Sequence, residues 1–312
     1  MLILCQKLKN TLKNQINSID ISIKVKSIYI MDLHKLGDEI GQCTNLVHLK
    51  LTMDKNILDE KSSIYIFQQI AKCVNLTSLS LFLNHFDINN SGSSALGKTI
   101  SQRANLKIIQ IDLKQNQLGN TGTSLLCQGI GSCSQFKTLS LYLQANHIQA
   151  EGIQGLIQGI QNCSRMQELN LLIGYVISYQ QSKVQLNKLK RNNQITNEGL
   201  IAIGSYLSQL NELKILNLYL FNCRIKNTGL VDFCAYLKLC SKQIYIRFHL
   251  NESDIEYLEV GITCLINVIV QSKKLYQTSG YVKIKNLEEK TKLKLRRKLK
   301  KTKKLVINNF FF

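Results

Sequence analysis

Cysteine and histidine are the residues of this sequence that could hold a metal or carry out redox chemistry. Four of the 10 cysteines, Cys43, Cys73, Cys133 and Cys163, lie at multiples of 30 residues from one another. A zinc or redox site needs close pairs such as C-x-x-C, which the sequence lacks. The five histidines show no H-E-x-x-H spacing. We therefore expect no metal site and no cofactor, and we predict that the four cysteines are buried, reduced and stacked in a row.

Motifs of catalysis are also missing. The sequence contains no P-loop, no G-x-G-x-x-G and no G-x-S-x-G, and it has neither the H-R-D nor the D-F-G motif of a kinase. Its 20 acidic residues are scattered, and no pair of them stands out as an acid and a base. The sequence therefore favours a protein that is not an enzyme.

Apolar triplets explain the spacing of the cysteines. Six residues after Cys133 come Leu139, Leu141 and Leu143, and the same arrangement recurs along the chain. Alternation with a period of two predicts a strand with one buried face. The eight triplets are Ile19/Ile21/Ile23, Leu49/Leu51/Met53, Leu79/Leu81/Leu83, Ile109/Ile111/Leu113, Leu139/Leu141/Leu143, Leu169/Leu171/Ile173, Leu216/Leu218/Leu220 and Ile246/Phe248/Leu250.

The remainder of each repeat has a helical period. Ile153, Leu156 and Ile160 follow the spacing of three and four residues that marks one face of a helix. An asparagine stands between strand and helix in several repeats, where its amide would bond the turning backbone. Asn56, Asn116, Asn146 and Asn193 occupy this position, and Phe86, Cys223 and Ser253 replace it elsewhere.

One copy of the repeat reads Cys133-x-x-Phe136-x-x-Leu139-x-Leu141-x-Leu143-x-x-Asn146-x-Ile148-x-x-x-Gly152. This pattern and its copies resemble the leucine-rich-repeat family, in its ribonuclease-inhibitor-like branch. The resemblance covers about residues 5–260. It implies an α/β solenoid, or horseshoe, with parallel strands on the concave face and helices on the convex face. We expect about eight repeats of 30 residues in residues 1–270 and a basic C-terminal cap or tail in residues 271–312.

Residues between the buried positions of each strand point to the concave face. One column of these residues is rich in aromatic side chains, which protein interfaces use as hot spots. Scattered exposed aromatics are also common on ordinary surfaces. The predicted partner-binding residues are Phe82, Asp112, Tyr142, Leu172, Tyr219 and His249, together with Arg247 from the neighbouring column.

An insertion at about residues 174–190 interrupts the repeats. Insertions in repeat arrays often cluster on the binding side, which makes this segment a second candidate contact. A neutral insertion that the fold tolerates is the alternative.

The charge of the chain is concentrated near its C-terminus. Residues 271–312 carry 14 Lys or Arg and two acids, a net charge of +12 out of +20 for the chain. Three interpretations stay open: a cap or solvated extension of the solenoid, a nuclear import signal, and a contact for nucleic acid or anionic lipid. The basic residues concerned are Arg296, Arg297, Lys298, Lys300, Lys301, Lys303 and Lys304.

Together these features predict a scaffold that binds a protein partner through its concave face. The alternatives are a regulatory repeat arm related to a larger enzyme such as a kinase, and polyanion binding through the basic tail. We expect a cytoplasmic or nuclear location, because no signal peptide is evident and ten cysteines suit a reducing compartment. No apolar stretch reaches the roughly 20 residues that cross a bilayer.

Overall fold

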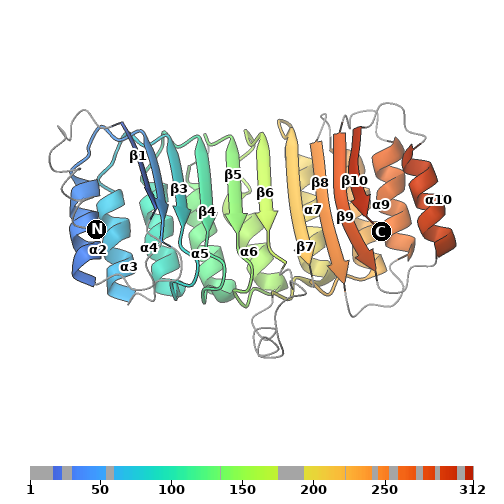
Figure 1. The fold of residues 1–312 in the computed structure, drawn as a ribbon, viewed down its shortest axis with the longest axis horizontal. Helices are drawn as coiled ribbons and strands as arrows, with labels where there is room; N and C mark the ends of the chain where they lie inside the picture. The colour runs from blue at the N-terminus through green and yellow to red at the C-terminus, as the bar shows by residue number, and fades with distance from the viewer. Residues whose placement is uncertain are drawn as a thin grey trace.

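Strands and helices alternate along the chain in the computed structural model (Figure 1). It describes residues 17–22, 30–53, 60–133, 135–174, 193–221, 223–240, 245–252, 259–271, 277–284, 289–300 and 306–311. The strands are β1 (Ser18–Ser22), β2 (His48–Thr52), β3 (Ser78–Phe82), β4 (Ile108–Asp112), β5 (Thr138–Tyr142), β6 (Glu168–Leu172), β7 (Ile215–Phe221), β8 (Tyr245–Glu252), β9 (Gln277–Ile284) and β10 (Val306–Phe311). The helices are α2 (Ile30–Gly41), α3 (Glu60–Ile70), α4 (Asn90–Ser101), α5 (Gly119–Gly131), α6 (Ala150–Ile160), α7 (Thr196–Gln209), α8 (Asn227–Leu239), α9 (Glu259–Gln271) and α10 (Glu289–Lys300).

The described strands form one sheet in sequential order from β1 to β10, and each pairs in parallel with the next. The predicted triplets share one register: Leu79 lies beside Ile109, and Leu139 beside Leu169. The predicted α/β solenoid is therefore confirmed as an open repeat array.

Two strands lie beyond the eight that the triplets predicted. β9 pairs with β8, and β10 pairs with β9. The sheet therefore continues past residue 270 into residues 271–312, where we expected a basic cap or tail. The sequence did not predict β9, because its residues at the triplet positions are Thr278, Gly280 and Val282 and do not form an apolar triplet.

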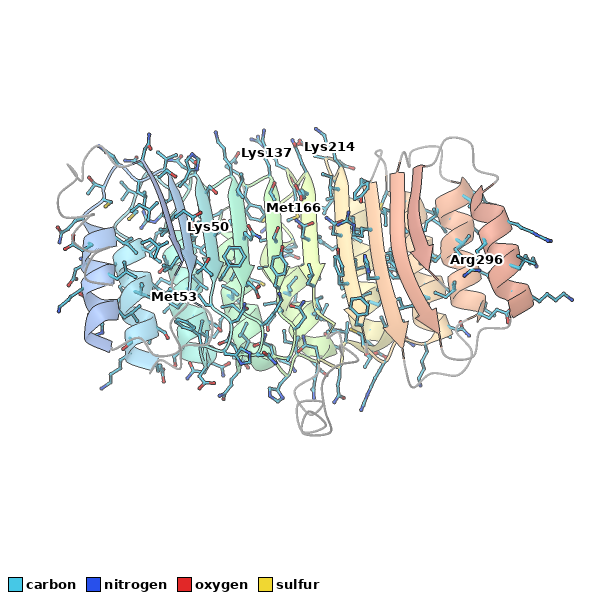
Figure 2. All side chains as sticks on the ribbon, viewed as in Figure 1. Lys50, Met53, Lys137, Met166, Lys214 and Arg296 are labelled. Atoms are coloured by element: carbon cyan, nitrogen blue, oxygen red, sulfur yellow. The ribbon has the colours of Figure 1, made fainter. Side chains whose placement is uncertain are left out.

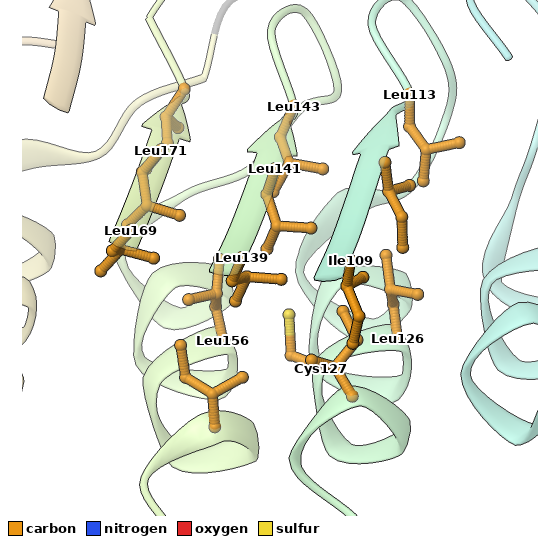
Figure 3. Close-up of a cluster of buried hydrophobic side chains, with 14 of the residues drawn as sticks. Ile109, Leu113, Leu126, Cys127, Leu139, Leu141, Leu143, Leu156, Leu169 and Leu171 are labelled. Carbon is orange, nitrogen blue, oxygen red and sulfur yellow. The ribbon is translucent and has the colours of Figure 1, made fainter. Parts of the chain in front are cut away.

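The helices that the structure describes all cover one face of the sheet, and none of them lies on the other face (Figure 1). We call this second face the open sheet face. Between sheet and helices lies a continuous apolar core, in which Leu139, Leu141 and Leu143 point toward Leu126 and Leu156 (Figure 3). Burial of one such side chain contributes about 1.5–3 kcal/mol. A single repeat has too few of them to fold alone, so the repeats stabilise one another.

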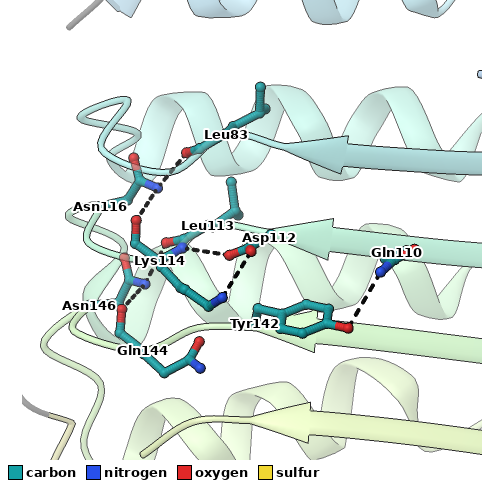
Figure 4. Close-up of polar contacts among 9 residues, drawn as sticks. All are labelled: Leu83, Gln110, Asp112, Leu113, Lys114, Asn116, Tyr142, Gln144 and Asn146. Carbon is teal, nitrogen blue, oxygen red and sulfur yellow. Dashed lines mark hydrogen bonds and ion pairs between the residues drawn. The ribbon is translucent and has the colours of Figure 1, made fainter. Parts of the chain in front are cut away.

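Asparagines close the turns after the central strands, as the sequence predicted. The Asn116 amide carbonyl accepts from the backbone of Phe86 and Ile88 at 3.0 and 2.9 Å, and its nitrogen donates to the Leu83 carbonyl at 2.9 Å. Asn146 donates to the Leu113 carbonyl (Figure 4) and also to the Leu143 carbonyl. Each amide therefore joins its own turn to the turn of the repeat before it.

The cysteine column joins neighbouring repeats on the helix side, and its predicted burial is confirmed. Cys73 and Cys133 donate to the carbonyls of Ile40 and Ile100, at the end of the preceding helix, at 3.3 and 2.9 Å. Arg103 fills the slot between these cysteines and donates to the Ala71 carbonyl, so it supplies the same inter-repeat contact. The insertion predicted at 174–190 lies outside the described residues except for Gly174.

Candidate functional site

A row of large side chains crosses the open sheet face from β3 to β8. These residues alternate with the buried triplets along their strands, and their side chains therefore lie on the face opposite the helices. Five of the six are partly exposed. In register order the row is Phe82, Asp112, Tyr142, Leu172, Tyr219 and His249. The structure thus brings together the residues that the sequence predicted as a contact column.

Asp112 is the exception in this row, because its side chain is buried. Its side chain is only 4% exposed. It accepts from the Lys114 backbone at 3.2 Å and forms an ion pair with the Lys114 ammonium at 3.1 Å (Figure 4). Desolvation by burial raises the pKa of Asp112, and the Lys114 charge opposes that rise. The Asp112 carboxylate is therefore largely closed to solvent and holds the Lys114 ammonium on this face.

Lys114 in turn lies against Tyr142. The ammonium is 5.0 Å from the centre of the Tyr142 ring, a distance at which a cation attracts the face of an aromatic ring. Gln110 donates to the Tyr142 hydroxyl at 3.4 Å from the other side (Figure 4). The ring therefore stands in a fixed position on the open sheet face.

A second group of rings lies at the C-terminal end of the row. Tyr219 and His249 stack with ring centres 4.2 Å apart and planes 11° apart, and the Phe221 ring is 5.8 Å from His249. Burial, together with the nearby Arg247 charge, lowers the pKa of His249 to about 4. At neutral pH the stack therefore presents uncharged rings.

Arg247 adds a cation beside these rings. Its guanidinium donates to the Tyr245 hydroxyl at 2.8 Å, and the hydrogen bond with Tyr219 raises its pKa. The guanidinium is thus oriented by two tyrosines on neighbouring strands, and the predicted residue lies next to the aromatic row.

Small polar residues lie between Arg247 and the centre of the sheet. Asn170 donates to the Ser140 hydroxyl at 2.7 Å, and Asn217 donates to the Asn170 carbonyl oxygen. Ser140 and Asn170 are buried although they are on the open sheet face. The open sheet face therefore carries two neighbouring rows, one rich in aromatic side chains and one of hydrogen-bonded polar residues.

The sequence-based prediction missed Lys114, Phe221 and Tyr245. Each lies two residues from a predicted residue on the same strand or its extension, and a period of two places it on the same face. Continuing the alternation past both ends of each triplet would have found them.

The basic segment lies at the other end of the array from β1. Arg296 (Figure 2) and Arg297 are exposed on α10, and the sequence of this helix also includes Lys298 and Lys300. Lys301, Lys303 and Lys304 lie outside the described residues. Thr291 is buried and donates to the Glu259 carboxylate of α9 at 2.7 Å. In the predicted tail, the helix α10 is therefore packed beside α9, between the strands β9 and β10 in the chain.

In the part of the chain that the structure describes, no group of three His, Cys, Asp or Glu side chains is arranged to hold a metal ion. None of the described helices has both the length and the apolar character to cross a bilayer. In comparisons with known proteins, no family model and no curated protein matches the sequence.

Proposed function

We propose that this protein is an interaction scaffold of the leucine-rich-repeat kind, in the ribonuclease-inhibitor-like branch, and that it binds a protein partner on the open sheet face. The observation that carries the proposal is the row of partly exposed residues Phe82, Tyr142, Leu172, Tyr219 and His249, which come from five strands in one register.

The rigidity of the row favours binding. Each residue of the row is anchored on a strand that is hydrogen-bonded to its neighbours, so a partner loses little free energy in ordering it. Tyr142 is further fixed by Gln110 and Lys114. Rigid aromatic side chains of this kind supply most of the binding energy in known interfaces.

The charges on the face are largely paired with one another. Lys50 forms an ion pair with Asp20 at 2.9 Å, and Lys114 is paired with Asp112. We therefore expect the partner to be selected by shape and apolar contact, with Arg247 as the polar contact at one end of the row. Because the buried thiols suit a reducing compartment, we place this binding in the cytoplasm, with the nucleus as the alternative.

A regulatory arm related to a larger enzyme, such as a kinase, is the second candidate from the repeat pattern. It shares the same binding face and differs only in the identity of the partner. Catalytic activity of the purified chain would be needed to favour an enzyme over a scaffold.

The test is the double substitution Phe82→Ala/Tyr142→Ala, with Val74→Ala/Val231→Ala as the control. Val74 and Val231 are exposed apolar residues outside the sheet, 56% and 37% exposed. Partners would be captured with the wild-type protein and identified, and their dissociation constants measured for both variants. We expect the open-face variant to bind at least about tenfold more weakly, because one hot-spot aromatic contributes about 2 kcal/mol.

The melting temperature separates binding from folding. Both variants should melt close to the wild type, as substitutions at surface positions usually do. A folded open-face variant that binds every captured partner as tightly as the wild type would contradict the proposal.

A further inference from the structure

The terminal helix α10 carries a concentration of positive charge on the helix side of the array. Seven of its 12 residues are Lys or Arg and one is acidic, so the helix has a net charge of +6. This surface is separate from the open sheet face and is not used by the proposed partner binding.

The exposed cations of α10 form a stripe. Lys290, Lys294 and Arg297 are all exposed. They are four and three residues apart, and this spacing places them on one side of a helix. Thr291 of the same helix is buried, and its hydroxyl is bonded to Glu259. The contact with α9 therefore leaves these three cations exposed.

Apolar side chains are exposed beside these cations. Leu293, three residues after Lys290, is 48% exposed. Val260 is 63% exposed in the first turn of α9. Thr291 is bonded to Glu259, the residue before Val260, so this exposed valine belongs to the turn of α9 that contacts α10.

We propose that this stripe binds the surface of an anionic lipid bilayer, with Lys290, Lys294 and Arg297 on the lipid headgroups and Leu293 inserted among the upper acyl carbons. Cations beside exposed apolar residues match the interface of an anionic membrane. A nucleic acid would use the cations alone, and Leu293 would gain nothing against a phosphodiester backbone. The mixed surface therefore favours lipid over nucleic acid.

Vesicle binding tests the charged part of the proposal. The full chain would be titrated with vesicles of phosphatidylcholine alone and of phosphatidylcholine mixed with phosphatidylserine. We expect binding to the mixed vesicles only. Because one basic residue near an anionic surface contributes roughly a fivefold gain in affinity, Lys290→Gln/Lys294→Gln/Arg297→Gln should weaken binding on the order of a hundredfold.

The matched control removes three cations elsewhere. Lys107, Lys137 and Lys214 are exposed at the amino ends of the strands, where Figure 2 shows Lys137 and Lys214. Lys107→Gln/Lys137→Gln/Lys214→Gln changes the net charge equally and should bind vesicles about as tightly as the wild type. If both triple variants lose the same affinity, net charge alone explains the binding and the assignment to α10 is wrong.

Insertion of Leu293 has its own readout, because the sequence contains no tryptophan. In Leu293→Trp the single indole should shift its emission to shorter wavelength on anionic vesicles. Val74→Trp, at an exposed site far along the chain, should show no shift. Absence of a shift in Leu293→Trp on bound vesicles would contradict insertion. Binding to single-stranded RNA without binding to vesicles would replace the lipid with a nucleic acid.

Discussion

The central repeats and the C-terminal repeats share one register but end their strands differently. β2 to β6 are each five residues long, whereas β7 has seven residues and β8 and β9 have eight. The strands shorten where the asparagine amides bond the turn. Asn116, Asn146 and Asn193 supply these bonds after β3, β4, β5 and β6.

The turn after β7 has no such amide at its own position. Cys223 replaces the asparagine, and its thiol donates to the Phe221 carbonyl at 3.6 Å. Residues 220 and 221 instead stay paired with Leu250 and Asn251 of β8. From β3 to β8, the turns that an asparagine bonds follow five-residue strands, whereas the triplet decides which face of every strand is buried.

The helices of the two regions also pack differently. In the central repeats a β-carbon added at Gly129 would lie 2.2 Å from the Gly97 carbonyl oxygen, so α4 and α5 are in backbone contact. At Gly204 in α7 the nearest atom is a ring carbon of Phe233 at 3.0 Å. A side chain can move aside more readily than a backbone can.

Gly129→Ala should therefore cause the largest loss in the free energy of unfolding. The added methyl group must push α4 and α5 apart, and overpacking of this kind costs about 3 kcal/mol. Gly204→Ala is the matched substitution in the C-terminal region and should cost less than about 1 kcal/mol, since the Phe233 ring can shift and alanine favours the helix. Urea unfolding of both variants measures the difference, and equal losses would contradict the contrast in packing.

Asn146→Ala should cause the next largest loss in the free energy of unfolding. It leaves the carbonyls of Leu113, Leu143 and Gln144 without the amide donor, and a buried unpaired polar group costs about 1–3 kcal/mol. Cys223→Ala removes one weak thiol bond and should cost about 1 kcal/mol, mainly from the lost buried volume. Thermal unfolding compares the two, and a costlier Cys223→Ala would show that the asparagine does not control the turn.

The effects of pH on stability should be smaller than the effects of these substitutions. The contribution of the C-terminal region to stability should fall as the pH falls, and that of the central region should rise. The pKa of His249 falls from 6.5 to about 4 on folding. Between these values the unfolded chain binds more protons, so His249 destabilises the fold as the pH falls. His249→Phe should keep the stack on Tyr219 and lose less melting temperature than the wild type between pH 7 and pH 4.

Asp112 provides the central counterpart. Its pKa is raised by burial, so its contribution to stability is greatest at low pH and is lost as the pH rises through the raised value. Asp112→Asn should consequently lose more melting temperature than the wild type as the pH falls from 7 to 4. Identical pH profiles of wild type and both variants would contradict both shifts.

Thiol labelling disturbs the fold least. Burial raises the pKa of Cys73 and of Cys163 to about 12, so these thiols stay protonated at neutral pH and should react only when the protein opens. Cys264 in α9 is partly exposed and should react earlier. Mass spectrometry of peptides after timed labelling measures the order, and early modification of Cys163 would argue against its buried packing.

Much of the fold followed from the sequence because its signals are local. The alternation of Leu139, Leu141 and Leu143 specifies a strand and its buried face without knowledge of the neighbours. The 30-residue spacing aligns the strands from β1 to β6 and again β7 with β8, which predicted the order of these strands and the aromatic row.

Other features depended on contacts between residues far apart in the sequence. β9 has no apolar triplet, and its pairing with β8 defines it as a strand. Asp112 appeared accessible from its place in the column, but Lys114 and the neighbouring strand bury it. The position of the Tyr142 ring depends on Gln110 from the adjacent strand, 32 residues away. The sequence by itself determined which residues face the core, and the tertiary structure decided which of the outward residues a partner can reach, because burial of one side chain depends on the size of its neighbours across the sheet.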